Sequence, residues 1–132
     1  EAIKINVGAA LPELENPPQE YAVQGRDLMT GIPKEIVISY VEIAHALDKT
    51  ISKIEEAILN ALELTPPELS ADIFKTGIYL AGGGSMLRGL DKRLSRKTDL
   101  PVYVAEDPLR AVVRGTGIAL KEIEKYKSVL MK

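Results

Sequence analysis

The chain contains no cysteine and only one histidine, His45, among its 132 residues. Without cysteine the protein has no disulfides and no thiolate metal sites, which is typical of cytosolic proteins. His45 has no second histidine with which to chelate a metal, so we interpret it as a surface or packing residue. No apolar run reaches the ~18 residues of a membrane span, and the N-terminus shows no signal-peptide pattern.

The sequence also lacks a large excess of charge of either sign, since the net charge is −2 and the pI is about 5.5. No basic stripe with interleaved aromatic residues occurs, so the sequence predicts no nucleic-acid binding. The hydrophobic share of 45% and the charged share of 27% fit one ordinary globular domain or a piece of one. Because the first residue is Glu1 rather than methionine, we expect the chain to be excised from a longer protein.

The most informative segment covers residues 77–90, where an apolar, β-rich run meets three consecutive glycines, Gly82 to Gly84. Ser85 and an apolar-periodic stretch beginning at Met86 follow. This pattern predicts a strand, a bare backbone turn and a helix N-terminus. Unpaired N–H groups and the positive end of a helix dipole attract anions there, and glycine lets a ligand approach the main chain.

Two better-known phosphate loops are excluded. A dinucleotide fingerprint starting at Gly82 needs glycine where Leu87 stands, and one starting at Gly115 needs glycine where Leu120 stands. No Gly-Lys-Ser/Thr sequence occurs, so there is no P-loop. A strand-to-helix turn that needs positive φ would use similar glycines without any ligand, and this alternative stays open.

The first half of the sequence predicts a β-hairpin followed by a long helix. Residues 1–7 fit either a strand or the last turns of a helix ending at Gly8, and residues 11–20 fit an exposed, proline-rich loop. The runs 21–23 and 36–38 are β-rich and have a turn-rich connection. Ser39 and Glu42 form a capping box that starts a helix reaching about residue 64.

That long helix has an apolar stripe at three- and four-residue spacing. The stripe consists of Val41, Ala44, Leu47, Ile51, Ile54, Ile58, Ala61 and Leu62. We interpret the opposite, charged face as solvated; it consists of Asp48, Lys49, Lys53, Glu55 and Glu56.

The second half predicts a β-α-β-α unit after a short helix. Thr65 and Glu68 form a second capping box, and Asp107 with Pro108 is expected to cap the last helix, which carries Gly115 and Gly117 inside it. The expected elements are a helix to near residue 75, a buried strand 78–81, a helix 86–94, a strand 101–104, a helix from 107 and a charged helical tail 121–132. Such a unit favours parallel strands, with ligands at their carboxyl ends. The fold class is therefore α/β, with a small antiparallel strand and helix part.

Four segments together resemble one known family. These are Gly-Arg-Asp-Leu with Thr-Gly-Ile-Pro in 25–33, Thr-Pro-Pro-Glu-Leu-Ser-Ala-Asp-Ile in 65–73, the glycine segment 77–90, and Ala-Glu-Asp-Pro-Leu with Gly-Thr-Gly in 105–117. In this order they are similar to the C-terminal part of the MreB family of bacterial actin homologues, in the actin, hexokinase and heat-shock ATPase superfamily. The resemblance implies part of an actin-like, ribonuclease-H-like ATPase fold. Residues 1–64 would then belong to the smaller nucleotide-cleft subdomain and 65–132 to the larger one.

The resemblance also implies a nucleotide site for ATP or ADP. Its adenosine motif would be Gly82, Gly83, Gly84 and Ser85, and its adenine and ribose side the helix end formed by Glu1, Ala2, Ile3 and Lys4. Glu1 and Lys4 would be the contacts there, and their spacing of three places both on one helix face.

The family's two phosphate loops and its water-orienting acid have no counterpart in this sequence. Hydrolysis needs Mg²⁺ near the β- and γ-phosphates and a positioned water, so magnesium would be held by the missing half. We therefore expect no catalysis and no metal site from this segment alone. Four acids have a better role in turns, on helix surfaces or as caps, namely Asp27, Asp72, Asp91 and Asp107.

The family's biology supplies further expectations. The whole protein would form filaments in the cytoplasm, at the inner face of the plasma membrane, with the cell-wall elongation machinery as partner and no membrane contact through this segment. A second hypothesis is a structural or interaction module without a nucleotide site. A third is a fragment of a sugar or acetate kinase, which would not explain residues 25–33 or 65–73.

Overall fold

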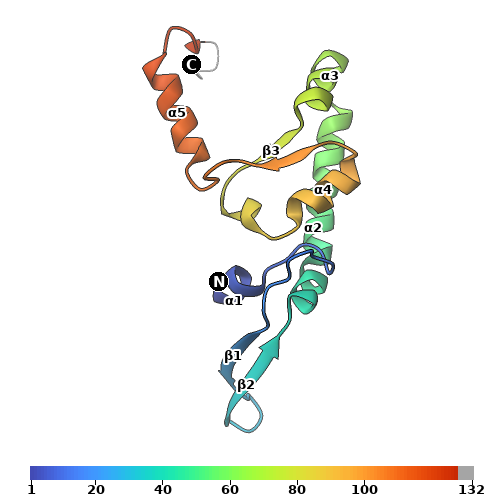
Figure 1. The fold of residues 1–132 in the computed structure, drawn as a ribbon, viewed down its shortest axis with the longest axis vertical. Coiled ribbons are helices and arrows are strands. Elements are labelled where there is room, and N and C mark those ends of the chain that lie inside the picture. The colour runs from blue at the N-terminus through green and yellow to red at the C-terminus, as the bar shows by residue number, and fades with distance from the viewer. Residues whose placement is uncertain (128–132) are drawn as a thin grey trace.

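The computed structural model describes residues 1–127 and forms an elongated α/β molecule (Figure 1). A β-hairpin occupies one end, and two helices project at the other end. The long helix α2 runs from the hairpin toward the other end, and α1 and α4 pack against it. Among residues 1–127, no helix is both long enough and apolar enough to cross a membrane.

The N-terminal part follows the sequence prediction closely. Helix α1 covers Ala2–Val7 and ends at Gly8, so the helical alternative for this segment is confirmed. Strands β1, Tyr21–Arg26, and β2, Pro33–Ile38, pair antiparallel, with Tyr21 opposite Ile38 and Arg26 opposite Pro33. Because the strands extend into the turn-rich segment, the connection is shorter than expected and covers residues 27–32.

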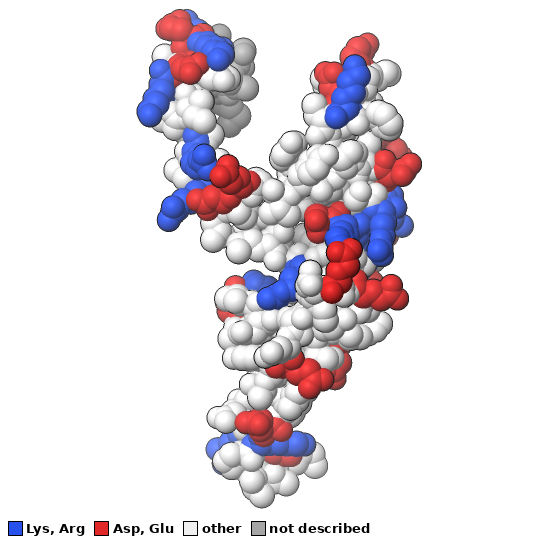
Figure 2. Space-filling view, in the orientation of Figure 1, with Lys and Arg blue, Asp and Glu red and all other residues white. Residues whose placement is uncertain are grey.

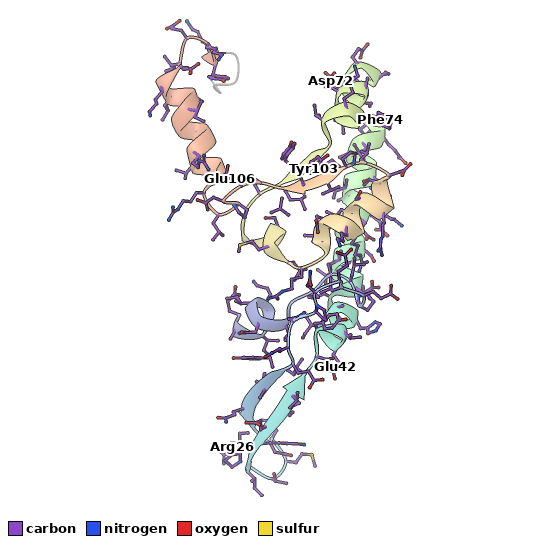
Figure 3. All side chains as sticks on the ribbon, in the orientation of Figure 1. Arg26, Glu42, Asp72, Phe74, Tyr103 and Glu106 are labelled. Carbon is purple, nitrogen blue, oxygen red and sulfur yellow. The ribbon has the colours of Figure 1, made fainter. Side chains whose placement is uncertain are left out.

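The capping box at the start of α2, Tyr40–Glu63, is confirmed. The Ser39 hydroxyl accepts a hydrogen bond from the Glu42 N–H at 3.3 Å, and the Glu42 carboxylate accepts one from the Ser39 N–H at 2.8 Å. The backbone hydrogen bond from Ser39, followed by the one from its hydroxyl, lowers the pKa of Glu42. Figure 3 shows Glu42 where β2 passes into α2.

Replacing Ser39 with alanine removes this cap and is expected to reduce the free energy of unfolding by about 1 kcal/mol. A urea titration of the full-length protein measures the change. Ser39→Asn is the control, because asparagine caps equally well and its stability should stay near that of the wild type. Equal losses in both variants would contradict a capping role.

The second half contains the expected parallel unit with shorter elements. Helix α3 covers Pro67–Thr76, strand β3 Ile78–Leu80, the 3-10 turn η1 Gly83–Met86, helix α4 Leu90–Thr98, strand β4 Val102–Val104 and helix α5 Ala111–Lys121. Strands β3 and β4 pair parallel, with Ile78 opposite Val102. Residues 122–126 form turns rather than the expected helical tail, and residues 128–132 of that tail lie outside the described residues.

Three expected helix starts differ from the structure. The Thr65 hydroxyl donates to the Ala61 carbonyl at 2.7 Å, so it does not cap α3, whose N-cap position is Pro66. Helix α4 begins at Leu90 instead of Met86. Asp107 has a φ of +49° and lies in a turn, so α5 begins only at Ala111.

The core lies where α2, α4 and the segment after α1 meet. Its buried cluster consists of Ala10, Ile51, Leu90 and Leu94, with Leu47, Ile58, Leu80, Leu87 and Val102 packed against it. The central part of the predicted stripe on α2 is therefore buried, whereas Ile54 remains 45% exposed. Burial of this kind contributes most of the stabilisation of short helices.

Residues 1–127 leave much of the β3–β4 layer exposed. The Tyr79 side chain is 67% exposed, so the expected fully buried strand is wrong for this residue. Its ring lies 5.3 Å from that of Tyr103 on β4, centroid to centroid. Figure 2 shows a broad uncharged surface between the projecting α3 and α5. Parallel sheets are usually covered on both faces, which is consistent with a segment of a larger protein.

Candidate functional site

The three glycines form a tight turn directly after β3. Gly82 has a φ of +83°, which favours glycine, and its N–H donates to the Pro108 carbonyl at 2.8 Å. The Ser85 hydroxyl donates to the Gly82 carbonyl at 2.7 Å, and Ser85 itself is only 6% exposed. Ser85 therefore closes the turn with its own side chain.

The outer side of this turn is open backbone. The N–H groups of Gly83 and Gly84 belong to the first turn of η1, where a helix offers no internal partner. A Cβ atom built on Gly82 or Gly84 would meet no atom of residues 1–127 within 4 Å, and one on Gly83 would meet only Leu109, at 3.4 Å. A flat or charged ligand can therefore approach the main chain here.

The helix expected directly after the turn is displaced. Leu87 is extended and Gly89 is left-handed, with a φ of +76°, before α4 begins at Leu90. The dipole of α4 therefore does not start at Ser85, and the first turn of η1 is the only helical N–H end at residues 82–85.

Helix α1 carries the other four predicted site residues, Glu1, Ala2, Ile3 and Lys4. The Lys4 ammonium lies 2.9 Å from the Glu1 carboxylate, and both side chains are mostly exposed. The hydrogen bond from Lys4, followed by its charge, lowers the pKa of Glu1. The two residues share one face of α1, as their spacing predicts, whereas Ala2 is exposed and Ile3 half-buried.

No hydrogen bond within residues 1–127 joins α1 directly to the glycine turn; the link runs through Arg88. Its guanidinium donates to the carbonyls of Ile5, at 3.2 Å, and Gly8, at 3.4 Å. Its own carbonyl accepts from the Ala10 N–H at 2.8 Å. Sequence reasoning missed Arg88, because its partners lie about 80 residues earlier and no local pattern marks them.

A second missed arginine, Arg93, anchors α4 to α2. Its guanidinium lies 2.7 Å from Glu55 and 2.8 Å from Asp48. Glu55 is 6% exposed, so its assignment to a solvated face is wrong. The sequence shows the charged face of α2 but not that α4 brings a cation against it.

Of the four acids assigned structural roles, Asp27 is the one whose side chain holds a turn. Asp27 accepts hydrogen bonds from the N–H groups of Met29, at 2.8 Å, and Thr30, at 3.1 Å, and these two bonds lower its pKa. It is therefore a turn residue, as expected. Within the described range 1–127, no group of three or more acidic, histidine or cysteine residues is placed to hold a metal ion.

The parallel β3–β4 unit, the open glycine turn and the neighbouring α1 define an actin-like α/β protein. The crystal structure of MreB5 of Spiroplasma citri bound to ADP superposes with a TM-score of 0.87 and 38% identity, over 97% of this chain and 38% of that one. The AMPPNP-bound structure of the same protein gives a TM-score of 0.85 and 37% identity, over 96% of this chain and 38% of that one.

The family model of the MreB/Mbl protein matches residues 1–128, and the chain belongs to this family. The cell shape-determining protein MreB of Escherichia coli is 44% identical over 96% of this chain and 36% of its own length. The cell shape-determining protein Mbl of Bacillus cereus is 42% identical over 95% of this chain and 37% of its own length. The chain thus spans little more than a third of these curated relatives.

Proposed function

We propose that this chain forms the adenosine-side wall of the nucleotide cleft in an ATP-binding, actin-like cell-shape protein. The observation that supports this most directly is the open backbone of Gly83 and Gly84, whose N–H groups belong to the first turn of η1 and which carry no Cβ. The related MreB5 protein of Spiroplasma citri has been solved with ADP and with AMPPNP. Residues 82–85 and residues 1–4 would hold ADP or ATP from two sides.

The remainder of the site would come from the rest of the protein. In this proposal residues 1–64 belong to the smaller cleft subdomain and 65–132 to the larger one. Mg²⁺ and the phosphate loops would be supplied by the other half, and ATP bound between the halves would favour a closed subunit that polymerises. This chain would contribute filament contacts in the cytoplasm, beneath the plasma membrane, near the cell-wall elongation machinery.

An interaction module without a nucleotide site is the competing proposal, and exposed apolar side chains favour it. Leu28 and Met29 at the hairpin tip are 98% and 95% exposed, and Phe74 on α3 is 69% exposed. Figure 3 shows Arg26 near the hairpin tip and Phe74 close to the opposite end, so these surfaces lie far apart. They suit subunit contacts and do not by themselves involve residues 82–85.

Replacing Gly83 with aspartate in the full-length protein separates the two proposals. The new carboxylate would occupy the nucleotide's place and repel its phosphates, so ADP affinity should fall by well over tenfold, about 1.4 kcal/mol or more. Calorimetric titration of ADP and ATP measures the loss.

Gly25→Asp is the matched control, because Gly25 has open space around it and lies in the hairpin. Its ADP affinity should equal that of the wild type. Normal binding by a folded Gly83→Asp variant would reduce the three glycines to a tight turn, and the interaction module would then become the better proposal.

A further inference from the structure

Helix α1 is a weak element that depends on Arg88. It has only six residues, and Glu1 at its N-cap makes no capping hydrogen bond through its side chain. Helices this short are unstable without tertiary contacts, and the last carbonyls of any helix lack internal partners. The Arg88 guanidinium donates to two carbonyls at this end, those of Ile5 and Gly8. A cation at a helix C-terminus also interacts favourably with the helix dipole.

Arg88 reaches α1 from the segment that leaves the glycine turn. It follows Ser85 by three residues, and its backbone forms a parallel bridge with Ala9. A Cβ atom on Gly8 would lie 3.1 Å from the Leu87 side chain, which shows how closely the two segments approach. Arg88 thus holds the end of α1 through its side chain and the residues just after α1 through its backbone.

We propose that Arg88 is a positioning residue of the nucleotide site, which keeps Glu1 and Lys4 at a fixed place relative to residues 82–85. This inference rests on the proposed nucleotide-binding function. Arg88 acts through α1 and need not touch the nucleotide. Its side chain is exposed, unlike that of Arg93, so its removal leaves the core cluster intact.

The test is a double-mutant cycle in the full-length protein, with ADP affinity measured by calorimetry. Arg88→Ala should weaken ADP binding about threefold to tenfold, because the loss of two hydrogen bonds loosens α1. Lys4→Ala should weaken binding through the loss of its own contact. The loss of ADP affinity in the double variant should be smaller than the product of the two single losses, because Lys4 on a misplaced α1 no longer reaches the nucleotide.

Two further variants serve as a control and as a conservative replacement in this cycle. Arg96→Ala removes an exposed arginine from the last turn of α4 and should leave ADP affinity unchanged. Arg88→Lys keeps a cation near the end of α1 and should recover part of the affinity. A residue that only stabilised the fold would alter the melting temperature without coupling to Lys4.

The outcomes separate this inference from the proposed function. If Gly83→Asp abolishes binding while Arg88→Ala binds ADP as the wild type does, the role of Arg88 is wrong and the function stands. If both variants bind normally, both proposals are overturned. If the effects of Arg88→Ala and Lys4→Ala multiply fully, Arg88 does not act through α1.

Discussion

Replacing Arg93 with methionine is expected to lower the free energy of unfolding by about 3 kcal/mol, because it leaves Glu55 buried without its partner. The Arg93 side chain is 13% exposed and that of Glu55 8% exposed. Urea titration of the full-length protein, followed by circular dichroism, measures the loss.

The size of this effect follows from how fully Arg93 is bonded. Besides Glu55 and Asp48, its guanidinium donates to the Ala10 carbonyl and to the Ser52 hydroxyl, each at 3.2 Å. The hydrogen bond that Arg93 donates to the Glu55 carboxylate is the main factor that raises the pKa of Arg93 above its ordinary value. An arginine guanidinium is charged at every working pH, and methionine can replace its length but none of its bonds.

Two control variants test this explanation. Combining Arg93→Met with Glu55→Leu should recover most of the stability, because an apolar pair leaves no unpaired buried charge. Lys92 lies on α4 next to Arg93 and forms an exposed pair with Glu15 of the loop after α1, at 2.8 Å. Lys92→Met breaks this pair and should cost less than about 1 kcal/mol. Equal losses from Arg93→Met and Lys92→Met would show that burial of the pair does not matter.

Replacing Gly77 with alanine is expected to destabilise the protein by about 2–5 kcal/mol. Gly77 ends α3 with a φ of +79° and a ψ of −173°, a conformation almost restricted to glycine. A Cβ atom there would lie 2.6 Å from the Pro101 carbonyl oxygen and 2.9 Å from the Tyr103 ring. The same carbonyl accepts the Ile78 N–H at 2.8 Å, so moving it away would separate β3 from β4.

Gly25→Ala provides the matched comparison, since Gly25 lies in β1 with nothing within 4 Å of its potential Cβ. Alanine there should leave stability unchanged or raise it slightly, because it restricts the unfolded chain. Thermal melting of both variants of the full-length protein gives the comparison. A Gly77→Ala protein as stable as Gly25→Ala would refute the steric argument.

The elements that sequence reasoning placed correctly depend on neighbouring residues. The capping box of Ser39 and Glu42 starts α2 through bonds that span three residues, and the β1–β2 hairpin pairs residues that are close in the chain. Composition and spacing are therefore sufficient to predict these elements. The family resemblance and the α/β fold were also correctly predicted.

The displaced starts of α4 and α5 have a tertiary cause. Arg88 forms a parallel bridge with Ala9, and its carbonyl accepts the Ala10 N–H at 2.8 Å, so the segment before α4 is extended. The Pro108 carbonyl accepts the Gly82 N–H at 2.8 Å instead of a bond within α5. Local sequence patterns likewise could not predict the hydrogen-bond partners of Arg88 and Arg93, because these partners come from distant helices and loops. The roles of residues 1–4 and 82–85 in binding stay predictions.

The bond from Arg93 to Ala10 also has a consequence for the order in which the chain folds during synthesis. The two residues are 83 positions apart, and Ala10 is fully buried. At the usual rates of about 5–20 residues per second, a ribosome needs roughly 4–17 s to make the intervening chain. Throughout that interval Ala10 lacks Leu90 and Leu94 of α4, which form the core cluster with it. The buried residues just after α1 are therefore expected to acquire protection from proteases only after α4 has been synthesised.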